Sequence, residues 1–328
     1  MRCVALVESP GLGWLDSNRH HRRDRLASHY WNVMEVEAFK NKKEQVKGGG
    51  VCIYCGWDGG EDSLRSEHIV PYSLAGNVEL LGASCRRCEK ITSYLDGYLA
   101  NAIYGHFRVH VDLQSRSGHP PILSATVQRE DRETDIEFAP KDHPYFLNMP
   151  IWQPPGVMRG AQMSEEFGSI DKHVYWYLPD NIRETIGLGD GEIARIVDKS
   201  REPNIATFSR ALAKIAYCDA VRRHGLDGFR PLATPDIILG KYKNIAYFIG
   251  SERRVPLPPY PRGFPHSVTS GTMTYGRLKL LTSTIRLFGD SGTKEHGMPF
   301  YIVVYGAEGH HKVTPKRPLP ELPRQILL

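Results

Sequence analysis

The chain has 328 residues, of which 41% are hydrophobic and 24% charged, as is ordinary for a globular protein large enough for two cores. No apolar run approaches the ~18–20 residues of a membrane helix, and residues 3–7 fall short of the roughly 7–15 apolar residues of a signal peptide. We therefore expect a cytoplasmic protein with no membrane partner, and the six cysteines do not indicate a disulfide framework.

Charge is distributed unevenly along the chain, whose net charge is +5. The net charge is +3 in residues 1–50, −3 in residues 51–115, −5 in residues 116–200 and +10 in residues 201–328. A protein that holds a polyanion needs a positive surface, so the last third is the better candidate for contact with nucleic acid. The alternative is that these charges only form a solvated surface.

Residues 1–48 are predicted to be an N-terminal tail that is partly disordered. Gly, Pro, Ser and Asp interrupt its start, and the basic cluster at residues 19–25 is more typical of a solvated tail than of a phosphate site. Residues 27–46 have the composition of a helix. Gly48, Gly49 and Gly50 then predict a hinge before the next segment.

Two CxxC pairs bracket residues 56–84 and organise the middle of the chain. Each pair can direct two thiolates to one point, and four thiolates complete the tetrahedral shell of a structural zinc ion. The 29 residues between the pairs exceed the usual zinc-ribbon spacing and leave room for a loop and a β-hairpin. The predicted zinc ligands are Cys52, Cys55, Cys85 and Cys88.

A hairpin and a helix are predicted within and after this segment. Residues 65–70 have the character of a strand that stops at Pro71, which cannot continue a ladder, and residues 80–83 are expected to form the return strand. After Cys88, apolar residues recur at spacings of three and four as far as Ile103, which predicts a helix.

The sequence EHIVP, together with CxxC and the CRRCEK that enters the helix, resembles the HNH endonucleases of the ββα-metal type with a four-cysteine zinc. The resemblance covers roughly residues 50–105, about a sixth of the chain. It implies metal-dependent cleavage of nucleic-acid phosphodiester bonds, with DNA favoured over RNA, and a catalytic Mg²⁺ or Mn²⁺ separate from the zinc. By the same resemblance, Glu67 is the acidic metal ligand and His68 is the general base.

Glu89 departs from the family pattern, because Asn or His usually follows the fourth cysteine as a second metal ligand. A carboxylate suits Mg²⁺ or Mn²⁺, so we expect Glu89 to share the catalytic metal with Glu67. The alternative is that Glu89 only interacts with the dipole of the first helical turn. Basic residues beside the helix start are candidates for phosphate contact, with a solvated role as the alternative: Arg86, Arg87 and Lys90.

The proposed chemistry constrains the hairpin. A neutral histidine can take a proton from water near physiological pH. Adjacent strand residues point to opposite faces, so Glu67 and His68 can share one site only if the strand bends or ends there, as Pro71 favours. If the site is inactive, the chain becomes a zinc-stapled module that binds nucleic acid or protein. A third alternative places the main function in the C-terminal region, with the zinc module as its effector.

The rest of the chain is predicted to contain both helices and strands. Residues 106–113 alternate apolar and polar side chains, which predicts a half-buried strand with His106 and His110 on its solvated face. Residues 203–223 predict a long helix that carries Cys218 as a buried thiol. Further strands are expected at residues 122–128, 134–139, 173–178, 244–250, 277–288 and 300–305.

These patterns together predict an α+β protein. After the tail, an HNH-like zinc module spans residues 49–118, and a larger mixed α+β domain of unknown role, basic in its last third, spans residues 119–328. The proline-dense residues 255–262 are expected to form a surface loop.

Overall fold

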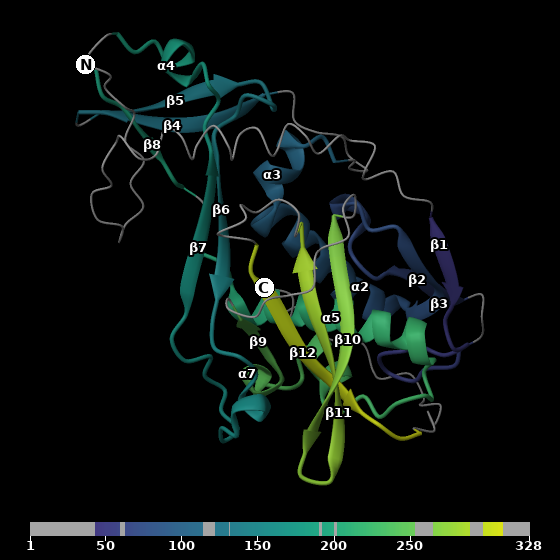
Figure 1. Cartoon of the computed structure of the whole chain (residues 1–328). Helices are drawn as coiled ribbons and strands as arrows, with labels where there is room; N and C mark the ends of the chain where they lie inside the picture. The colour runs from purple at the N-terminus through teal and green to yellow at the C-terminus, as the bar shows by residue number, and fades with distance from the viewer. Residues whose placement is uncertain are drawn as a thin grey trace.

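The computed structural model of this chain describes a mixed α+β protein whose strands form four sheets (Figure 1). The predicted fold class is therefore confirmed at the level of α+β. The described residues are 43–59, 63–113, 122–130, 132–189, 192–199, 202–252, 265–288 and 298–310.

The first sheet has the strand order β1-β3-β2 and contains the predicted hairpin. Strands β2 (Leu64–His68) and β3 (Val78–Cys85) pair antiparallel, with a register shift between Arg65 and Glu67. Strand β1 (Glu44–Lys47) runs parallel to β3. The prediction of a helix through residue 46 is wrong for these residues, because the open edge of β3 provides hydrogen-bond partners for their backbone. The rest of the expected tail lies outside the described residues.

Helix α2 (Arg86–Gly97) follows β3 directly, as predicted. It continues into one wide turn, η4 (Tyr98–Ile103), and then into the short helix α3 (Gly105–His110). The predicted strand at residues 106–113 is therefore wrong. Its alternating pattern misled because α3 is packed on more than one side: Phe107, Arg108 and Val109 are all buried, so burial there does not follow a period of two.

Three further sheets follow along the chain. Strands β4 (Leu123–Arg129) and β5 (Arg132–Phe138) form the predicted hairpin, and β8 (Arg195–Val197) pairs with β4. Strands β6 (Tyr145–Ile151) and β7 (Asp171–Tyr177) pair with each other. The four-stranded sheet has the order β10-β11-β12-β9 and comprises β9 (Ile249–Glu252), β10 (His266–Tyr275), β11 (Leu278–Leu287) and β12 (Phe300–Ala307).

Helix α5 (Ile205–His224) is the long helix predicted from the sequence, and it lies at the centre of the fold between α2 and the four-stranded sheet (Figure 1). The Asn204 side chain accepts a hydrogen bond from the Thr207 amide at its start, and Gly225, with a φ of 70°, ends it. The shorter helices are η3 (Tyr72–Leu74), η5 (Gly156–Arg159), α4 (Ile182–Thr185), α6 (Thr234–Ile238) and α7 (Ile245–Phe248).

The predicted strand at residues 244–250 is correct only at its end. Residues Ile245–Phe248 form the helix α7, and the strand β9 begins at Ile249. Ile245 and Phe248 are both buried and lie three residues apart, a spacing that a helix turn satisfies as well as a short apolar strand does. The proline-dense residues 255–262 lie outside the described part of the chain.

One large core connects the β2–β3 hairpin and α2 to the C-terminal half. Its buried members include Cys52 and Leu95 from the first half and Phe208 and Val303 from the second. A second, smaller core lies under β4, β5 and β8. The expected boundary between residues 118 and 119 stays a prediction. Among the described residues, no helix combines the length and apolar character needed to cross a membrane.

Candidate metal centre and the charge cluster beside it

The first cysteine pair lies in a tight turn that the backbone closes on itself. The Gly56 amide donates to the Cys52 carbonyl at 2.8 Å, and the Cys52 amide donates to the Trp57 carbonyl at 2.8 Å. Gly56 has a φ of 72°, a conformation that favours glycine. The Ile53 amide donates to the Ala83 carbonyl at 2.8 Å, which ties this turn to β3.

The second cysteine pair lies at the junction of β3 and α2. Cys85 is the last residue of β3 and the N-cap of α2, and Cys88 lies in the first helical turn. The positive end of the helix dipole favours thiolates at this position. The hairpin and the helix therefore meet at the two cysteines that the sequence predicts as zinc ligands.

The four cysteine sulfurs lie within 4.8 Å of one another and form a site that can bind a metal ion such as zinc. The Sγ atoms of Cys55 and Cys85 are 3.8 Å apart. A tetrahedral zinc with bonds of about 2.3 Å requires an edge of about 3.8 Å, so the spacing fits this metal. In the described part of the chain, no other group of three or more His, Cys, Asp or Glu residues has its ligand atoms this close together.

The electrostatics of this cluster favour a cation. A hydrogen bond with Cys52 lowers the pKa of the Cys55 thiol to about 7. Hydrogen bonds with neighbouring sulfurs lower the pKa of Cys85 and raise that of Cys88. The opposite directions arise because crowded sulfurs cannot all be charged without compensation. A divalent cation removes this conflict and stabilises all four thiolates.

Helix α5 packs directly against the turn that carries Cys52 and Cys55. The Tyr217 hydroxyl donates to the Ile53 carbonyl at 2.8 Å. The Tyr54 hydroxyl lies 3.2 Å from the Cys218 sulfur, which is a buried free thiol as predicted. These contacts couple the metal centre to the core of the C-terminal half.

Glu67 lies on the inner side of the hairpin, where its carboxylate is only 4% exposed. The Thr92 hydroxyl of α2 donates to its Oε1 at 2.6 Å, and the Lys214 Nζ of α5 lies 3.8 Å from its Oε2. Burial raises the pKa of Glu67, and the Lys214 ammonium and the Thr92 hydroxyl oppose that effect. Both carboxylate oxygens therefore already have a partner from a neighbouring helix.

Lys214 is fully buried and is the centre of this cluster. Its Nζ lies 2.9 and 3.0 Å from the two carboxylate oxygens of Asp96, and it also donates to the backbone carbonyl of His68. Burial alone disfavours its charge, but the carboxylates of Asp96 and Glu67 raise the pKa of Lys214 above its ordinary value. The sequence patterns did not point to Lys214 or Asp96 as site residues. The one signal for Lys214 was the position of a lysine beside the apolar stripe of a strongly predicted helix.

His68 ends β2 and lies opposite Glu79 in the hairpin register. Its ring centroid is 5.8 Å from that of Tyr72, and it is partly exposed. Glu79 also accepts from Gln45 at 2.9 Å and pairs with Lys43 at 2.6 Å, so it faces β1. Glu67 and His68 thus lie on opposite faces of the hairpin, as adjacent strand residues normally do.

The remaining candidates lie around the start of α2. Glu89 is half-buried in its first turn, and its backbone carbonyl lies 3.2 Å from the Thr92 hydroxyl. Arg86 and Lys90 are exposed, and Arg87 is partly exposed. No group of three metal-ligating side chains that includes Glu67 or Glu89 occurs among the residues with described positions.

A cavity of about 300 Å³ lies between α3, β4, β6 and β8. His106 and His143 meet there, with ring centroids 4.7 Å apart. A carbonyl oxygen can only accept, so His143 donates to the Ser124 carbonyl through Nε2, at 3.1 Å. Burial lowers the pKa of His143 to about 4, which keeps its ring neutral near pH 7. Because residues 105–110 form a helix, His106 lies beside this cavity rather than on a solvated strand.

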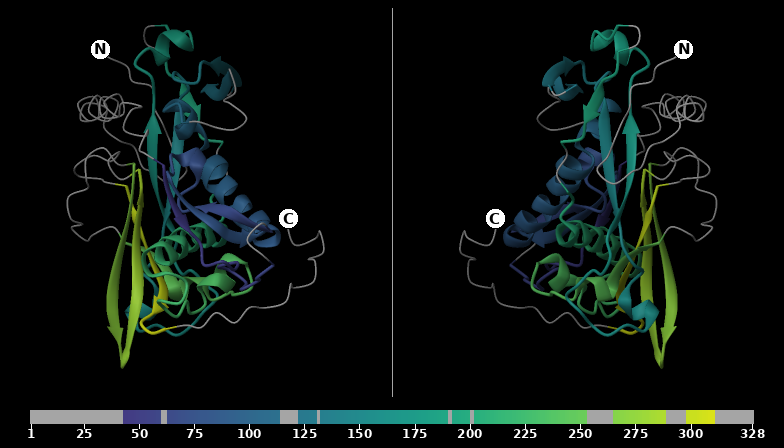
Figure 2. Two further views of the ribbon diagram at one scale, coloured as in Figure 1. Left: turned by 90° about the vertical axis from the view of Figure 1, so that its right-hand side faces the viewer. Right: turned by 90° about the vertical axis from the view of Figure 1, so that its left-hand side faces the viewer.

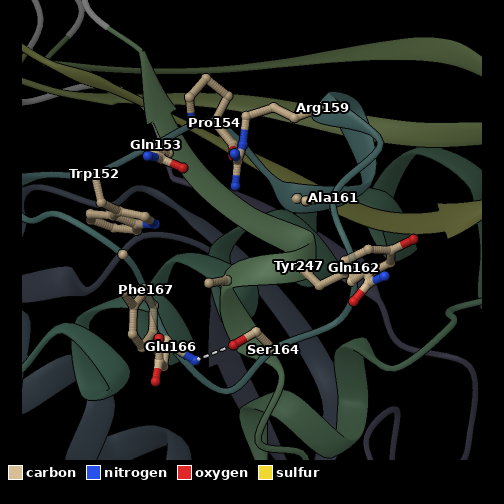
Figure 3. A pocket seen from close by; sticks show the side chains of 13 residues that line it. Trp152, Gln153, Pro154, Arg159, Ala161, Gln162, Ser164, Glu166, Phe167 and Tyr247 are labelled. Atoms are coloured by element: carbon tan, nitrogen blue, oxygen red, sulfur yellow. Dashed lines mark hydrogen bonds between the residues drawn. The ribbon is translucent and has the colours of Figure 1, made fainter.

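A second, shallower pocket of about 190 Å³ lies beside η5 and α7 (Figure 3). Trp152, Phe167 and Tyr247 supply aromatic surface, and Arg159 supplies a positive charge. The Arg159 Nε donates to the Pro154 carbonyl at 2.9 Å, which leaves the outer guanidinium nitrogens for other contacts. The sequence analysis did not identify this pocket, because its lining comes from segments far apart in the chain.

Comparisons with protein-family models, with curated proteins and with solved structures find no match for this chain. The fold and the four-cysteine site define an α+β protein with a candidate zinc centre at the junction of a hairpin and a helix. The resemblance to HNH endonucleases rests on the sequence motifs.

Proposed function

We propose that this chain is a metal-dependent endonuclease of HNH type that hydrolyses DNA phosphodiester bonds, with His68 as general base. The observation that carries the proposal is the four-cysteine cluster, which joins an antiparallel hairpin to the helix that follows it. His68 lies at the end of the first hairpin strand and is partly exposed, so water and a phosphate can reach it.

Glu79 gives His68 a positioned acidic neighbour. The two residues are register partners across the hairpin. Burial raises the pKa of Glu79, but hydrogen bonds from Lys43 and Gln45, with a smaller effect of His68, lower it below its ordinary value. A carboxylate beside an imidazole orients the ring and stabilises the imidazolium that forms when the base takes a proton. This pairing supports His68 as the base independently of Glu67.

The catalytic metal is the more demanding part of the proposal. Mg²⁺ or Mn²⁺ held by Glu67 and Glu89 would neutralise charge on the phosphate and on the departing oxygen. In the arrangement described here, the Lys214 ammonium already compensates the Glu67 carboxylate, so the two cations would compete for it. Metal binding at Glu67 therefore requires Lys214 to move away, and a site shared with His68, which lies on the opposite face of the hairpin, requires the end of β2 to bend.

A second candidate function is that of a zinc-stapled DNA-binding module without cleavage. The buried cluster of Glu67, Lys214 and Asp96 favours it, because a carboxylate that is buried and paired needs no metal ion. In this alternative the cluster only attaches α5 to the hairpin, and the basic C-terminal third contacts the nucleic acid.

A supercoiled-plasmid assay separates the two functions. Zinc-loaded wild type, His68→Ala and the exposed control His310→Ala are compared with Mg²⁺, with Mn²⁺ and with no added divalent ion. The nuclease proposal expects metal-dependent nicking by wild type and control and a loss of about 100-fold or more in His68→Ala. Equal cutting by all three proteins contradicts His68 as the base.

Counting divalent ions gives an independent test. The nuclease proposal expects one weakly held Mn²⁺ in addition to the zinc, and its loss in Glu67→Gln. If none of the proteins cuts DNA and wild type retains zinc alone, while DNA binding persists, the second candidate is the correct one.

A further inference from the structure

The β10–β11 hairpin has a composition that distinguishes it from the rest of the surface. Residues 266–287 contain three basic residues and no Asp or Glu, although 24% of the whole chain is charged with both signs. The same segment contains nine hydroxyl side chains, namely Ser267, Thr269, Ser270, Thr272, Thr274, Tyr275, Thr282, Ser283 and Thr284. Hydroxyl and basic side chains are the groups that contact phosphates most often.

The end of this hairpin extends beyond its sheet. Strand β12 pairs with β11 only as far as Leu280, so the two strands continue without a third one towards the turn at Gly276. All residues from 274 to 279 are exposed, including Tyr275 at 44% and Leu278 at 45%. Figures 1 and 2 show the hairpin as a long ribbon at the outside of the molecule.

The charged groups at the tip are available to a ligand. Arg277 lies in the turn itself, and none of the ion pairs found among the described residues involves it. Lys279 is 62% exposed and pairs with Glu308 at 3.3 Å. Such an exposed pair contributes little to stability, so a phosphate can replace Glu308 at little cost.

One residue of the tip also lies near a residue of the pocket in Figure 3. The side chain of Tyr275 lies close enough to raise the pKa of Tyr247, and Tyr247 lines the pocket together with Arg159 and Glu166. These two tyrosines are the link between the hairpin tip and the pocket, and the cations of the tip itself are Arg277 and Lys279. Glu166 lines the pocket, and Glu308 pairs with Lys279.

We propose that the tip of the β10–β11 ribbon, residues 274–279, enters the major groove of duplex DNA, with Arg277 and Lys279 on the phosphates. This inference rests on the proposed function, because it takes DNA as the ligand. The major groove is about 12 Å wide and admits a two-stranded ribbon. The exposed tip folds back on itself and has three residues on each side. At about 3.3 Å per residue, it is long enough to reach the groove floor, which lies about 8.5 Å deep.

The test measures equilibrium binding to a DNA duplex of about 30 base pairs. Fluorescence anisotropy detects the binding over a range of salt concentrations. Ca²⁺ replaces Mg²⁺, so that binding is measured without cleavage. Wild type is compared with Arg277→Ala/Lys279→Ala and with the matched control Arg132→Ala/Lys199→Ala. The control residues lie on β5 and beside β8, at the far end of the molecule from the ribbon tip (Figure 1).

The ribbon variant is expected to bind about tenfold or more weakly, and its slope of log K against log salt is expected to fall by about two. The control is expected to bind as wild type does. Unchanged binding and slope in the ribbon variant, or equal loss in the control, overturns the proposal. Circular dichroism and zinc content confirm that each variant is folded.

A duplex RNA arm tests the groove assignment. The major groove of A-form RNA is deep and narrow, so the ribbon variant should lose little affinity for RNA. An equal loss for RNA and DNA overturns entry into the groove. If the ribbon variant binds weakly while no protein cuts plasmid, cleavage fails and the ribbon inference stands. If wild type cuts plasmid and the ribbon variant binds and cuts equally well, only the ribbon inference fails.

Discussion

At the scale of single residues, the buried charge of Lys214 is the feature with the largest energetic consequence. Its ammonium is fully buried and is compensated by Asp96 at 2.9 Å and by Glu67 at 3.8 Å. Removing one member of such a cluster leaves the others as uncompensated buried charges, which is far more costly than losing an exposed ion pair.

Lys214→Met is therefore expected to lower the free energy of unfolding by about 3–5 kcal/mol. The matched control is Lys172→Met, because Lys172 pairs with the exposed Glu202 at 2.8 Å and should contribute no more than about 1 kcal/mol. Urea unfolding of zinc-loaded proteins measures both. A loss below about 1 kcal/mol in Lys214→Met would show that the cluster does not hold α5 to the hairpin.

His266 gives the stability a dependence on pH. Its Nε2 donates to the Leu74 carbonyl and its Nδ1 accepts from the Phe288 amide at 3.3 Å, so the ring is neutral and uses both nitrogens. Burial lowers the pKa of His266 to about 4 from the ordinary value of 6.5. Between these values the unfolded chain binds a proton that the folded chain does not, so stability falls as the pH falls.

We expect His266 to remove up to about 3 kcal/mol of stability as the pH drops from about 7 to about 4. Urea unfolding across this range should show a weaker acid dependence for His266→Gln than for wild type. His143, whose pKa is also lowered to about 4, contributes in the same direction and keeps its share in the variant. Parallel pH curves for the two proteins would contradict the role of His266.

At the scale of elements, strand β9 depends on a close approach that only glycine permits. A Cβ at Gly250 would lie 2.4 Å from the Gln153 carbonyl oxygen and 2.4 Å from the Pro155 nitrogen, and both are backbone atoms. The loop after β6 therefore packs onto the backbone of β9, and a side chain there would push the two apart.

Gly250→Ala is expected to destabilise the protein by about 1–3 kcal/mol, the usual cost of overpacking. Gly105→Ala is the matched control, since a Cβ at the first residue of α3 meets nothing within 4 Å. That change should alter stability by no more than about 0.5 kcal/mol. Thermal unfolding of both variants measures the difference, and equal effects would mean that the loop moves freely away from β9.

The sequence patterns predicted the long helices correctly and two of the short ones incorrectly. The helices at α2 and α5 were predicted because several turns of apolar spacing exceed what chance produces. The short segments at α3 and α7 were predicted as strands, since four to six residues with mixed burial fit either period. Their conformation follows from packing against Phe288, Tyr145 and β9 rather than from their own pattern.

At the scale of the whole molecule, we expect the candidate metal centre and the core to unfold as one cooperative unit. Helix α5 is connected to the turn at residues 52–57 and to the hairpin through Tyr217, Tyr54 and Lys214. The large core includes residues from both halves of the chain. Loss of the metal should therefore lower the stability of the C-terminal half as well, because metal binding energy contributes to folding.

Removal of zinc by a strong chelator is expected to shift the whole calorimetric unfolding transition to lower temperature. Readdition of Zn²⁺ should restore the original transition, while Mg²⁺ should not, because thiolates are soft ligands. A large transition that keeps its temperature while a small one disappears would instead mean that the hairpin and α2 unfold separately from the rest.

Local sequence patterns were enough to predict the four-cysteine cluster that can bind a metal ion, the hairpin, both long helices and the α+β class. These features arise from local spacing: CxxC turns, apolar periodicity and strand-ending proline act over a few residues. The sequence patterns did not predict that Glu67 pairs with Lys214 or that His68 lies opposite Glu79, and these pairings appear only in the folded structure. The fold also brought Tyr275 of the β10–β11 hairpin close to Tyr247, which lines a pocket with Arg159. Those pairings join residues more than one hundred positions apart or depend on which face of a strand is covered, and a linear pattern does not contain that information.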